Sequence, residues 1–263
     1  MAKAGLHAIL LAAGRGRRLE QASGGIPKCL LEVGGSTLLE RHLRALAQHG
    51  LQRLSVVTGY RADLIDDALR AISPPLMVRR VFNSEFELGS ARSLWCALDA
   101  LRSPVDVLLM DADVLYAPAV LAPLTSSSRS GLLLDRGVSL SDTEAVKVCV
   151  RDDEIVEFSK HPVLSIRPDY VAESVGFFRF TADMVRRIAN HLSLRQLQSG
   201  LDFPHENVLR SVMLEEPSSF ALHDVTGTPW IEIDFPSDVR RAREEILPRL
   251  QRARAPETGP VIA

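Results

Sequence analysis

Glycines and cations follow the first apolar run of the sequence in a pattern that suits a polyphosphate. The run ends in Leu11-Ala-Ala-Gly14-Arg15-Gly16-Arg17-Arg18-Leu19, and Pro27-Lys28 follows after a short loop. Glycines after a strand let the backbone approach a ligand, while amides and cationic side chains hold phosphate oxygens. The dinucleotide fingerprint would need glycine at Leu19, and no GxxxxGK loop ending in Ser or Thr occurs. The pattern predicts a phosphate site of neither common type, with a glycine-rich turn bearing solvated arginines as the alternative.

Carboxylates stand at the ends of two later apolar runs. Asp111 and Asp113 end Leu108-Leu-Met-Asp-Ala-Asp, and Glu232 and Asp234 end Trp230-Ile-Glu-Ile-Asp. Ligands bind at the carboxyl ends of strands in open α/β sheets, so we expect the first pair beside the glycine loop. Alternation along a strand puts Glu232 and Asp234 on the same side. Oxygen ligands near phosphates suit Mg²⁺, although each acid taken alone is also typical of a helix cap or surface turn.

The elements that must position these residues can be predicted from periodicity. In the first half, apolar runs alternate with helical patterns, which is typical of βα units on a mostly parallel sheet. The expected strands are Leu6–Ala12, Leu54–Thr58, Met77–Phe82 and Val105–Met110. The expected helices are one that starts at the capping box Thr37-Leu-Leu-Glu40 and stops at Gly50, and those near Asp63–Ile72 and Ser90–Leu101.

After Asp113 the pattern changes to short strands and later helices. The expected strands are Gly131–Asp135, Ala145–Val150, Ile155–Ser159, Val175–Phe180, Phe220–His223 and Trp230–Ile233. The expected helices run from the Thr181 cap to about Leu197, after Pro204, and from Pro236. We therefore predict an α/β fold with a mostly parallel Rossmann-like sheet flanked by helices, and a smaller β-rich subregion in the second half. One domain is expected over residues 1–254, with halves at about 1–125 and 126–235, a final helix over 236–254, and a mobile tail over 255–263.

Composition narrows the class of protein. The 263 residues are 46% hydrophobic with a net charge of −2 and a mean hydropathy of +0.06, which argues against disorder and nucleic-acid binding. The first apolar run is too short for a membrane span. Three widely spaced cysteines without a CxxC pair favour a reduced, cytoplasmic protein. The 31 cationic residues include four lysines, Lys3, Lys28, Lys147 and Lys160, so their positions matter unless codon bias alone explains the scarcity.

The combination of LAAGRGRRL, Pro27-Lys28, MDADV and IEID resembles the nucleotidyltransferase superfamily, which makes NDP- and CMP-activated metabolites on a GT-A-like α/β fold. The length and the WIEIDFPSDVRRA ending are most similar to the CTP-dependent branch that includes phosphocholine and 2-aminoethylphosphonate cytidylyltransferases. The resemblance extends to about Leu247. It implies Mg²⁺-dependent transfer of CMP from CTP to a small phosphate monoester or phosphonate, with release of pyrophosphate, and it is compatible with a homodimer.

The resemblance also implies roles for individual residues. The nucleotide would be held by Leu11, Ala12, Ala13, Gly14, Arg15, Gly16, Asn83, Gly89, Ser90, Ser93 and Asp111. The catalytic cations would be Arg18 and Lys28 on the departing pyrophosphate and Lys147 or Lys160 on the α-phosphate. Asp113 and Asp234 would bind the metal. The acceptor side, in the β-rich subregion, would be formed by Glu173, Gly176, Trp230 and Glu232.

Departures from the family pattern leave the substrates open. Relatives often carry Tyr at the position of Ile231 and Asn at the positions of Gly89 and Ala91, so base contacts and acceptor identity are undetermined. A sugar-1-phosphate or inositol-phosphate nucleotidyltransferase shares the same chemistry and is one alternative. A nucleotide-binding regulatory module without catalysis is another, although such a module would be expected to lose acids that this chain retains.

Overall fold

The computed structural model describes residues 5–20, 24–101, 105–137, 143–163, 165 and 167–252. The tail expected over 255–263 lies outside the described residues. In the described part of the chain, no helix is both long and apolar enough to cross a membrane. Cys29, Cys96 and Cys149 are all free thiols, and Cys29 and Cys149 are buried.

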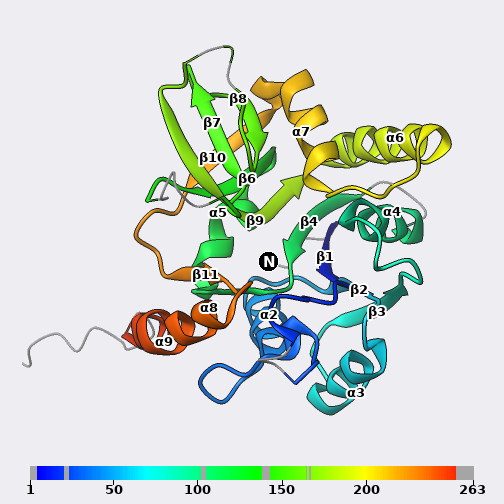
Figure 1. Ribbon diagram of the computed structural model, residues 1–263, viewed down its shortest axis with the longest axis vertical. Coiled ribbons are helices and arrows are strands. Elements are labelled where there is room, and N and C mark those ends of the chain that lie inside the picture. The colour runs from blue at the N-terminus through cyan, green and yellow to red at the C-terminus, as the bar shows by residue number, and fades with distance from the viewer. Residues whose placement is uncertain are drawn as a thin grey trace, which may run out of the picture.

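The first half of the chain forms the parallel part of a sheet (Figure 1). Its strands are β1 (Leu6–Ala12), β2 (Arg53–Thr58), β3 (Met77–Phe82) and β4 (Asp106–Asp111), in the spatial order β4-β1-β2-β3 with every pairing parallel. The helices between them are α2 (Leu38–Gln48), α3 (Ala62–Ile72) and α4 (Ser90–Leu101). The predicted βα alternation is confirmed to within about one residue at each boundary.

The second half continues the same sheet mainly through antiparallel pairings. Its strands are β6 (Ser130–Asp135), β7 (Lys147–Arg151), β8 (Glu154–Ser159), β9 (Tyr170–Phe180) and β10 (Phe220–Asp224). Strand β9 pairs antiparallel with β4, β6 and β7, and so joins the two halves, whereas the edge strand β10 pairs parallel with β6. Among the described residues this gives nine strands with the main order β10-β6-β9-β4-β1-β2-β3. The predicted fold class is confirmed.

Helices cover both faces of the sheet, as a parallel sheet buried on both sides requires. Ala8 and Leu10 of β1 face the hydrophobic cluster formed with α2 and α3, whereas Ile9 faces the cluster on the opposite side. That opposite cluster is closed by α4, α6 (Ala182–Gln198) and α7 (Glu206–Glu215). Both faces of the sheet are therefore buried, and the carboxyl ends of its parallel strands are left to form a site.

Local sequence signals explain where the helices begin. The Thr37 hydroxyl accepts a hydrogen bond from the Glu40 amide at 3.1 Å, and the Glu40 carboxylate accepts one from the Thr37 amide at 2.8 Å. This capping box satisfies two amides that the first turn of α2 would leave unpaired. Thr181 likewise caps α6 through the Met184 amide.

The connections and the C-terminal part complete the fold. Short elements are η1 (Lys28–Leu30), β5 (Val114–Tyr116), η2 (Pro118–Leu121), α5 (Ala122–Ser126), η3 (Pro217–Ser219) and β11 (Trp230–Glu232). The final helical stretch is α8 (Pro236–Arg241), a π-helical turn η4 (Ala242–Ile246) and α9 (Leu247–Arg252). This stretch packs Ala242, Ile246 and Leu250 against the cluster that contains α2.

Candidate active site

An antiparallel two-stranded ribbon brings together the acids that lie far apart in the sequence. Strand β11 pairs with β5 so that Glu232 lies opposite Val114, and the Ile233 amide donates to the Asp113 carbonyl at 3.0 Å. As a result, carboxylate oxygens of Asp113, Glu232 and Asp234 lie within 4.8 Å of one another. We call these three residues the acid cluster. Strand β11 ends at Glu232, so Asp234 lies in the turn just beyond it, but the two carboxylates still lie close together, as the alternation predicted.

A carboxylate at the start of α8 supports the turn that carries Asp234. The Asp238 side chain accepts hydrogen bonds from the backbone amides of Asp234 at 3.1 Å and Phe235 at 2.8 Å. These bonds fix the backbone where β11 ends and the helix begins. Asp234 therefore points at the cluster from a braced turn.

The Lys28 ammonium lies between two members of the acid cluster. Its Nζ donates to Asp113 Oδ2 at 2.8 Å and also to Asp234 Oδ1. Burial alone would lower the pKa of Lys28, but the two carboxylates outweigh it and the pKa is raised. Burial would raise the pKa of Asp234, yet Lys28 and then Arg18 hold it below its usual value. The two pKa shifts favour an ionised Lys28–Asp234 pair inside the site.

The glycine loop leaves room for this lysine. Gly16 has a φ of +63°, and a Cβ there would lie 2.9 Å from the Lys28 Cγ. A larger residue would be strained in its backbone and would also press on the lysine stem. Gly16 therefore leaves room for the side chain of Lys28.

Two other carboxyl groups in the cleft resist ionisation. Glu232 reaches solvent, but protein atoms crowd its carboxyl group, and this desolvation together with Asp113 and Asp234 raises its pKa well above the usual value. Desolvation, followed by the charges of Asp113 and Glu206, does the same for Asp111. A bound cation would relieve this repulsion. Because carboxylate oxygens are the ligands that Mg²⁺ prefers, the residues present fit a divalent metal ion.

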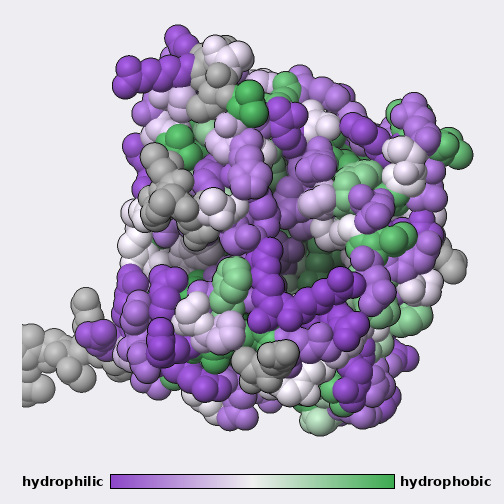
Figure 2. All heavy atoms as spheres, viewed as in Figure 1, coloured by the Kyte–Doolittle hydropathy of each residue, from purple (hydrophilic) through white to green (hydrophobic). Residues whose placement is uncertain are grey.

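A pocket, which we call the glycine-loop pocket, opens at the carboxyl ends of β1 and β4. Its lining includes eight of the residues predicted to hold a nucleotide: Leu11, Ala12, Ala13, Gly14, Gly16, Ser90, Ser93 and Asp111. Lys28, Asp113 and Glu232 also line it, so the acid cluster borders this pocket directly. On the face seen in Figure 2, the molecule is hollowed near its middle, and hydrophilic residues surround the hollow.

Three residues predicted to hold the nucleotide lie outside that lining. The Arg15 guanidinium forms an ion pair with Glu20 at 2.9 Å. Asn83 is buried, and its amide donates to the Ser93 hydroxyl at 3.0 Å, so it positions Ser93 from behind. Gly89 allows close packing, because a Cβ there would lie 2.1 Å from backbone atoms of Phe203. Asn83 and Gly89 therefore support residues near the pocket instead of lining it, and Arg15 pairs with Glu20.

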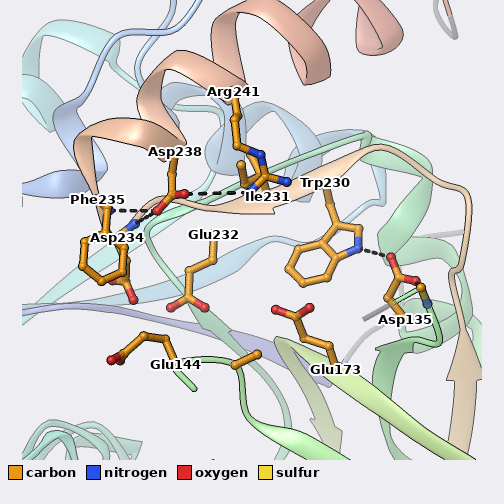
Figure 3. A pocket seen from close by; sticks show the side chains of 12 residues that line it. Asp135, Glu144, Glu173, Trp230, Ile231, Glu232, Asp234, Phe235, Asp238 and Arg241 are labelled. Atoms are coloured by element: carbon orange, nitrogen blue, oxygen red, sulfur yellow. Dashed lines mark hydrogen bonds and ion pairs between the residues drawn. The ribbon is translucent and has the colours of Figure 1, made fainter. Parts of the chain in front are cut away.

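A second pocket, the acidic pocket, adjoins the acid cluster through Glu232 and Asp234 (Figure 3). Its lining contains the carboxylates Asp135, Glu144, Glu173, Glu232, Asp234 and Asp238, together with Trp230, Phe235 and Arg241. The Trp230 indole donates to Asp135 Oδ2 at 2.8 Å, which fixes the ring between the carboxylates. Glu173, Trp230 and Glu232, all predicted for the acceptor side, therefore share one cavity, and Glu232 borders both pockets.

Gly176 lies outside the acidic pocket, although it was predicted to belong to the acceptor side. It has a φ of +78°, and a Cβ there would lie 2.5 Å from Asp111 Oδ2. Its place in β9 is therefore beneath the carboxylate of the glycine-loop pocket. Gly176 makes room for Asp111.

The other predicted cations differ in how closely they approach the acid cluster. Arg18 Nη1 lies 2.8 Å from Glu144 and 3.6 Å from Asp234, and Lys160 Nζ lies 3.5 Å from the same Glu144 carboxylate. Both cations thus contact Glu144, a lining residue of the acidic pocket, and are outside the lining themselves. Lys147 is buried on β7, where its ammonium donates to the Ala145 carbonyl at 3.1 Å, and it is outside the lining of both pockets.

The structure adds residues that the sequence reasoning missed. His205 and Glu206, at the start of α7, line the glycine-loop pocket, and Asp135 and Asp238 line the acidic pocket. Asp135 ends a predicted strand and Asp238 lies in the first turn of a predicted helix, so strand-end and helix-start rules could have flagged both. His205 follows Pro204 in a connection without periodicity, and no sequence signal marks it.

The parallel part of the sheet presents a glycine loop, cations and an acid cluster at one edge, as expected for an α/β protein of the nucleotidyltransferase class. Residues 8–171 match the family model described as the MobA-like NTP transferase domain. Because this match spans more than half of the sequence, the chain belongs to that family and is an enzyme of the nucleotidyltransferase class. The resemblance drawn from the motifs is confirmed.

Individual relatives agree with this assignment. The chain is 29% identical over 246 residues to the bifunctional IPC transferase and DIPP synthase of Rubrobacter xylanophilus, covering 92% of this chain and 52% of that protein. It is 24% identical over 258 residues to the CTP:phosphoglutamine cytidylyltransferase of Campylobacter jejuni, covering 89% and 98%. The solved inositol-1-phosphate CTP transferase from T. maritima matches with a TM-score of 0.71 at 26% identity, covering 94% and 99%. The chain spans about half the length of the bifunctional relative.

Proposed function

We propose that the protein is a Mg²⁺-dependent cytidylyltransferase that transfers CMP from CTP to a small phosphate monoester or phosphonate and releases pyrophosphate. The observation that carries this proposal is the position of the acid cluster between two pockets, one at the glycine loop and one lined by acceptor-side residues. A nucleotide in the first pocket and an acceptor in the second would meet at the cluster. That arrangement suits in-line transfer between two anions.

The chemistry needs no nucleophile from the protein. An oxygen of the acceptor forms a bond to the α-phosphorus of CTP while the bond from that phosphorus to the pyrophosphate oxygen breaks. Both reactants are already anions, so the protein must hold them in line and offset their repulsion. Mg²⁺ held by Asp113 and Asp234, with Glu232 beside it, would supply charge neutralisation at the reacting phosphates.

The protein's own cations serve the two ends of the reaction. Lys28, which lies at the border of the glycine-loop pocket, would exchange its carboxylate partners for phosphate oxygens when nucleotide binds. Arg18 would join it on the departing pyrophosphate. Lys160 lies near the acidic pocket through Glu144 and would face the α-phosphate, with Lys147 further back on β7.

The names of the relatives support CTP as the nucleotide, and the lining of the acidic pocket supports the class of acceptor. CTP is named as the substrate of the Campylobacter jejuni relative and of the T. maritima structure. The acidic pocket is rich in carboxylates and has an indole, a set that favours an acceptor with an ammonium group beyond its phosphate, as in phosphocholine or 2-aminoethylphosphonate. In this reading Glu173 and Asp135 pair with the ammonium group, and Trp230 offers its ring.

An inositol phosphate is the second candidate acceptor. Carboxylates also accept hydrogen bonds from vicinal hydroxyl groups, so the acidic pocket suits a polyol as well. The solved structure of the inositol-1-phosphate CTP transferase is similar over nearly its whole length, and this similarity favours the polyol. Both candidates share the same transfer step and differ only in the group that Glu173 and Trp230 contact.

Pyrophosphate release tests the proposal. Each nucleoside triphosphate is crossed against phosphocholine, 2-aminoethylphosphonate, inositol 1-phosphate and a hexose 1-phosphate, with Mg²⁺ and with EDTA. We expect release with CTP and one acceptor class, abolished by EDTA. Nucleotide binding without release in any combination would instead support a regulatory module that has lost catalysis.

A further inference from the structure

A buried histidine links the second half of the chain to the glycine-loop pocket. His205 is 4% exposed and lines that pocket from the start of α7. Its Nδ1 lies 3.0 Å from the Ser90 hydroxyl and 3.2 Å from Glu206 Oε2, and its backbone amide donates to the same hydroxyl at 2.9 Å. One residue therefore contacts the Ser90 hydroxyl twice.

The other ring nitrogen of His205 is turned toward a carboxylate of the pocket. Nε2 is buried, has no hydrogen-bond partner among the described residues, and lies 3.9 Å from Asp111 Oδ1. A buried polar atom without a partner costs free energy, so its retention calls for a role. In this position the imidazole separates Asp111 from the Ser90 hydroxyl and faces both.

The connection that precedes His205 is docked on the start of α4. The Gly89 amide donates to Asp202 Oδ1 at 3.1 Å, and the Ala91 amide donates to the Phe203 carbonyl at 3.0 Å. These bonds satisfy amides that have no partner inside the helix. The packing is too close for any side chain at Gly89, so the connection and α4 hold a fixed relative position.

We propose that His205 is a positioning residue of the nucleotide site, which holds the Ser90 hydroxyl through Nδ1 while its Nε2 faces the Asp111 carboxylate at 3.9 Å. The inference rests on the proposed function, because it takes the glycine-loop pocket as the place where CTP binds. Its consequence is specific. Affinity for CTP depends on the His205 side chain, whereas affinity for the acceptor does not.

Three substitutions separate the two contacts. His205→Ala removes both, His205→Asn keeps a polar group near the Nδ1 position, and His205→Gln keeps one near the Nε2 position. We expect His205→Ala to raise KM for CTP about tenfold, as loss of one hydrogen bond implies, with kcat and the acceptor KM nearly unchanged. His205→Asn should restore most of the affinity, because its polar group can still meet Ser90.

A matched control variant and two measurements distinguish a structural role of His205 from a positioning role. His191 on α6 is a histidine that contacts Glu215 at 3.0 Å away from both pockets, so His191→Ala should leave both KM values unchanged. Melting temperature and CTP binding by calorimetry are measured for every variant. A lowered melting temperature with an unchanged KM for CTP, or an equal rise in both KM values, overturns the inference.

The same assays separate failure of this inference from failure of the proposed function. If the unsubstituted protein releases no pyrophosphate with CTP and any acceptor, the proposed function is wrong. If it turns over and His205→Ala matches it in CTP affinity, the function stands and only the role of His205 is wrong.

Discussion

Lys28 Nζ lies 2.8 Å from Asp113 Oδ2, in the space between two carboxylates that the proposed reaction assigns to Mg²⁺. A residue predicted to hold phosphate therefore offsets the charge of the carboxylates proposed as metal ligands. In the proposed reaction, the ammonium would leave the carboxylates for the phosphates as the cation enters. The lysine would then couple binding of metal to binding of nucleotide.

Replacing Lys28 tests this exchange. Lys28→Met removes the internal cation, so Asp113 loses its ammonium partner and Asp234 keeps Arg18 at 3.6 Å, and metal affinity in the absence of nucleotide should rise by about tenfold or more. Turnover should fall because a phosphate contact is lost. Free Mn²⁺ measured by electron paramagnetic resonance gives the affinity directly. An unchanged Mn²⁺ affinity would show that the lysine does not compete with the metal.

The carboxylates of the acid cluster should be essential for turnover and dispensable for folding. Asp113→Asn and Asp234→Asn each remove a metal ligand, and we expect kcat to fall by about a thousandfold or more, given what a metal ion supplies in phosphoryl transfer. Asp152→Asn, at an 89% exposed side chain outside both pockets, is the control and should be silent. Near-normal turnover of either cluster variant would refute the assignment.

Gly176→Ala should damage the site more than the fold. The new Cβ would meet Asp111 Oδ2 at 2.5 Å and also strain a residue at a φ of +78°. Gly227→Ala is a matched control, since Gly227 has a φ of +86° with open space around it. Both variants should lose about 1 kcal/mol in the free energy of unfolding, and only Gly176→Ala should lose CTP affinity. Equal CTP affinities in the two variants would contradict a role through Asp111.

The raised pKa of Glu232 predicts how stability depends on pH without metal. The folded pKa lies above the unfolded value, so folding is favoured most below the unfolded pKa and stability is lost as pH rises toward the folded pKa. Glu232→Gln removes that loss. With EDTA present, the variant should melt above the unsubstituted protein at about pH 8, and the gap should shrink toward about pH 5. A gap independent of pH would contradict the raised pKa.

Much of the fold follows from local pattern. Strands β1 and β3 and helix α4 were predicted with the bounds observed, because apolar periodicity and capping residues act within a few positions. Strand β9 was predicted from Val175 but begins at Tyr170, where its residues pair with β7. That extension depends on a partner distant in the sequence, which periodicity cannot reveal.

The sequence predicted which residues form the candidate site better than it predicted how they are arranged in space. Asp113 and Asp234 could be found at strand ends, but the β5–β11 pairing that joins them is a long-range contact. Lys28 was expected on phosphate and lies on carboxylates, since an ammonium takes the nearest anions when no ligand is present. His205 was missed because its role depends on where a connection without a pattern packs.

The position of bond cleavage in CTP tests the central claim most directly. The protein is incubated with Mg²⁺, the acceptor that supports pyrophosphate release, and CTP labelled at either the α- or the γ-phosphorus. We predict that the α label appears in a product that joins CMP to the acceptor, and the γ label in pyrophosphate. Release of the γ label as inorganic phosphate, or an α label that never joins an acceptor, would contradict cytidylyl transfer.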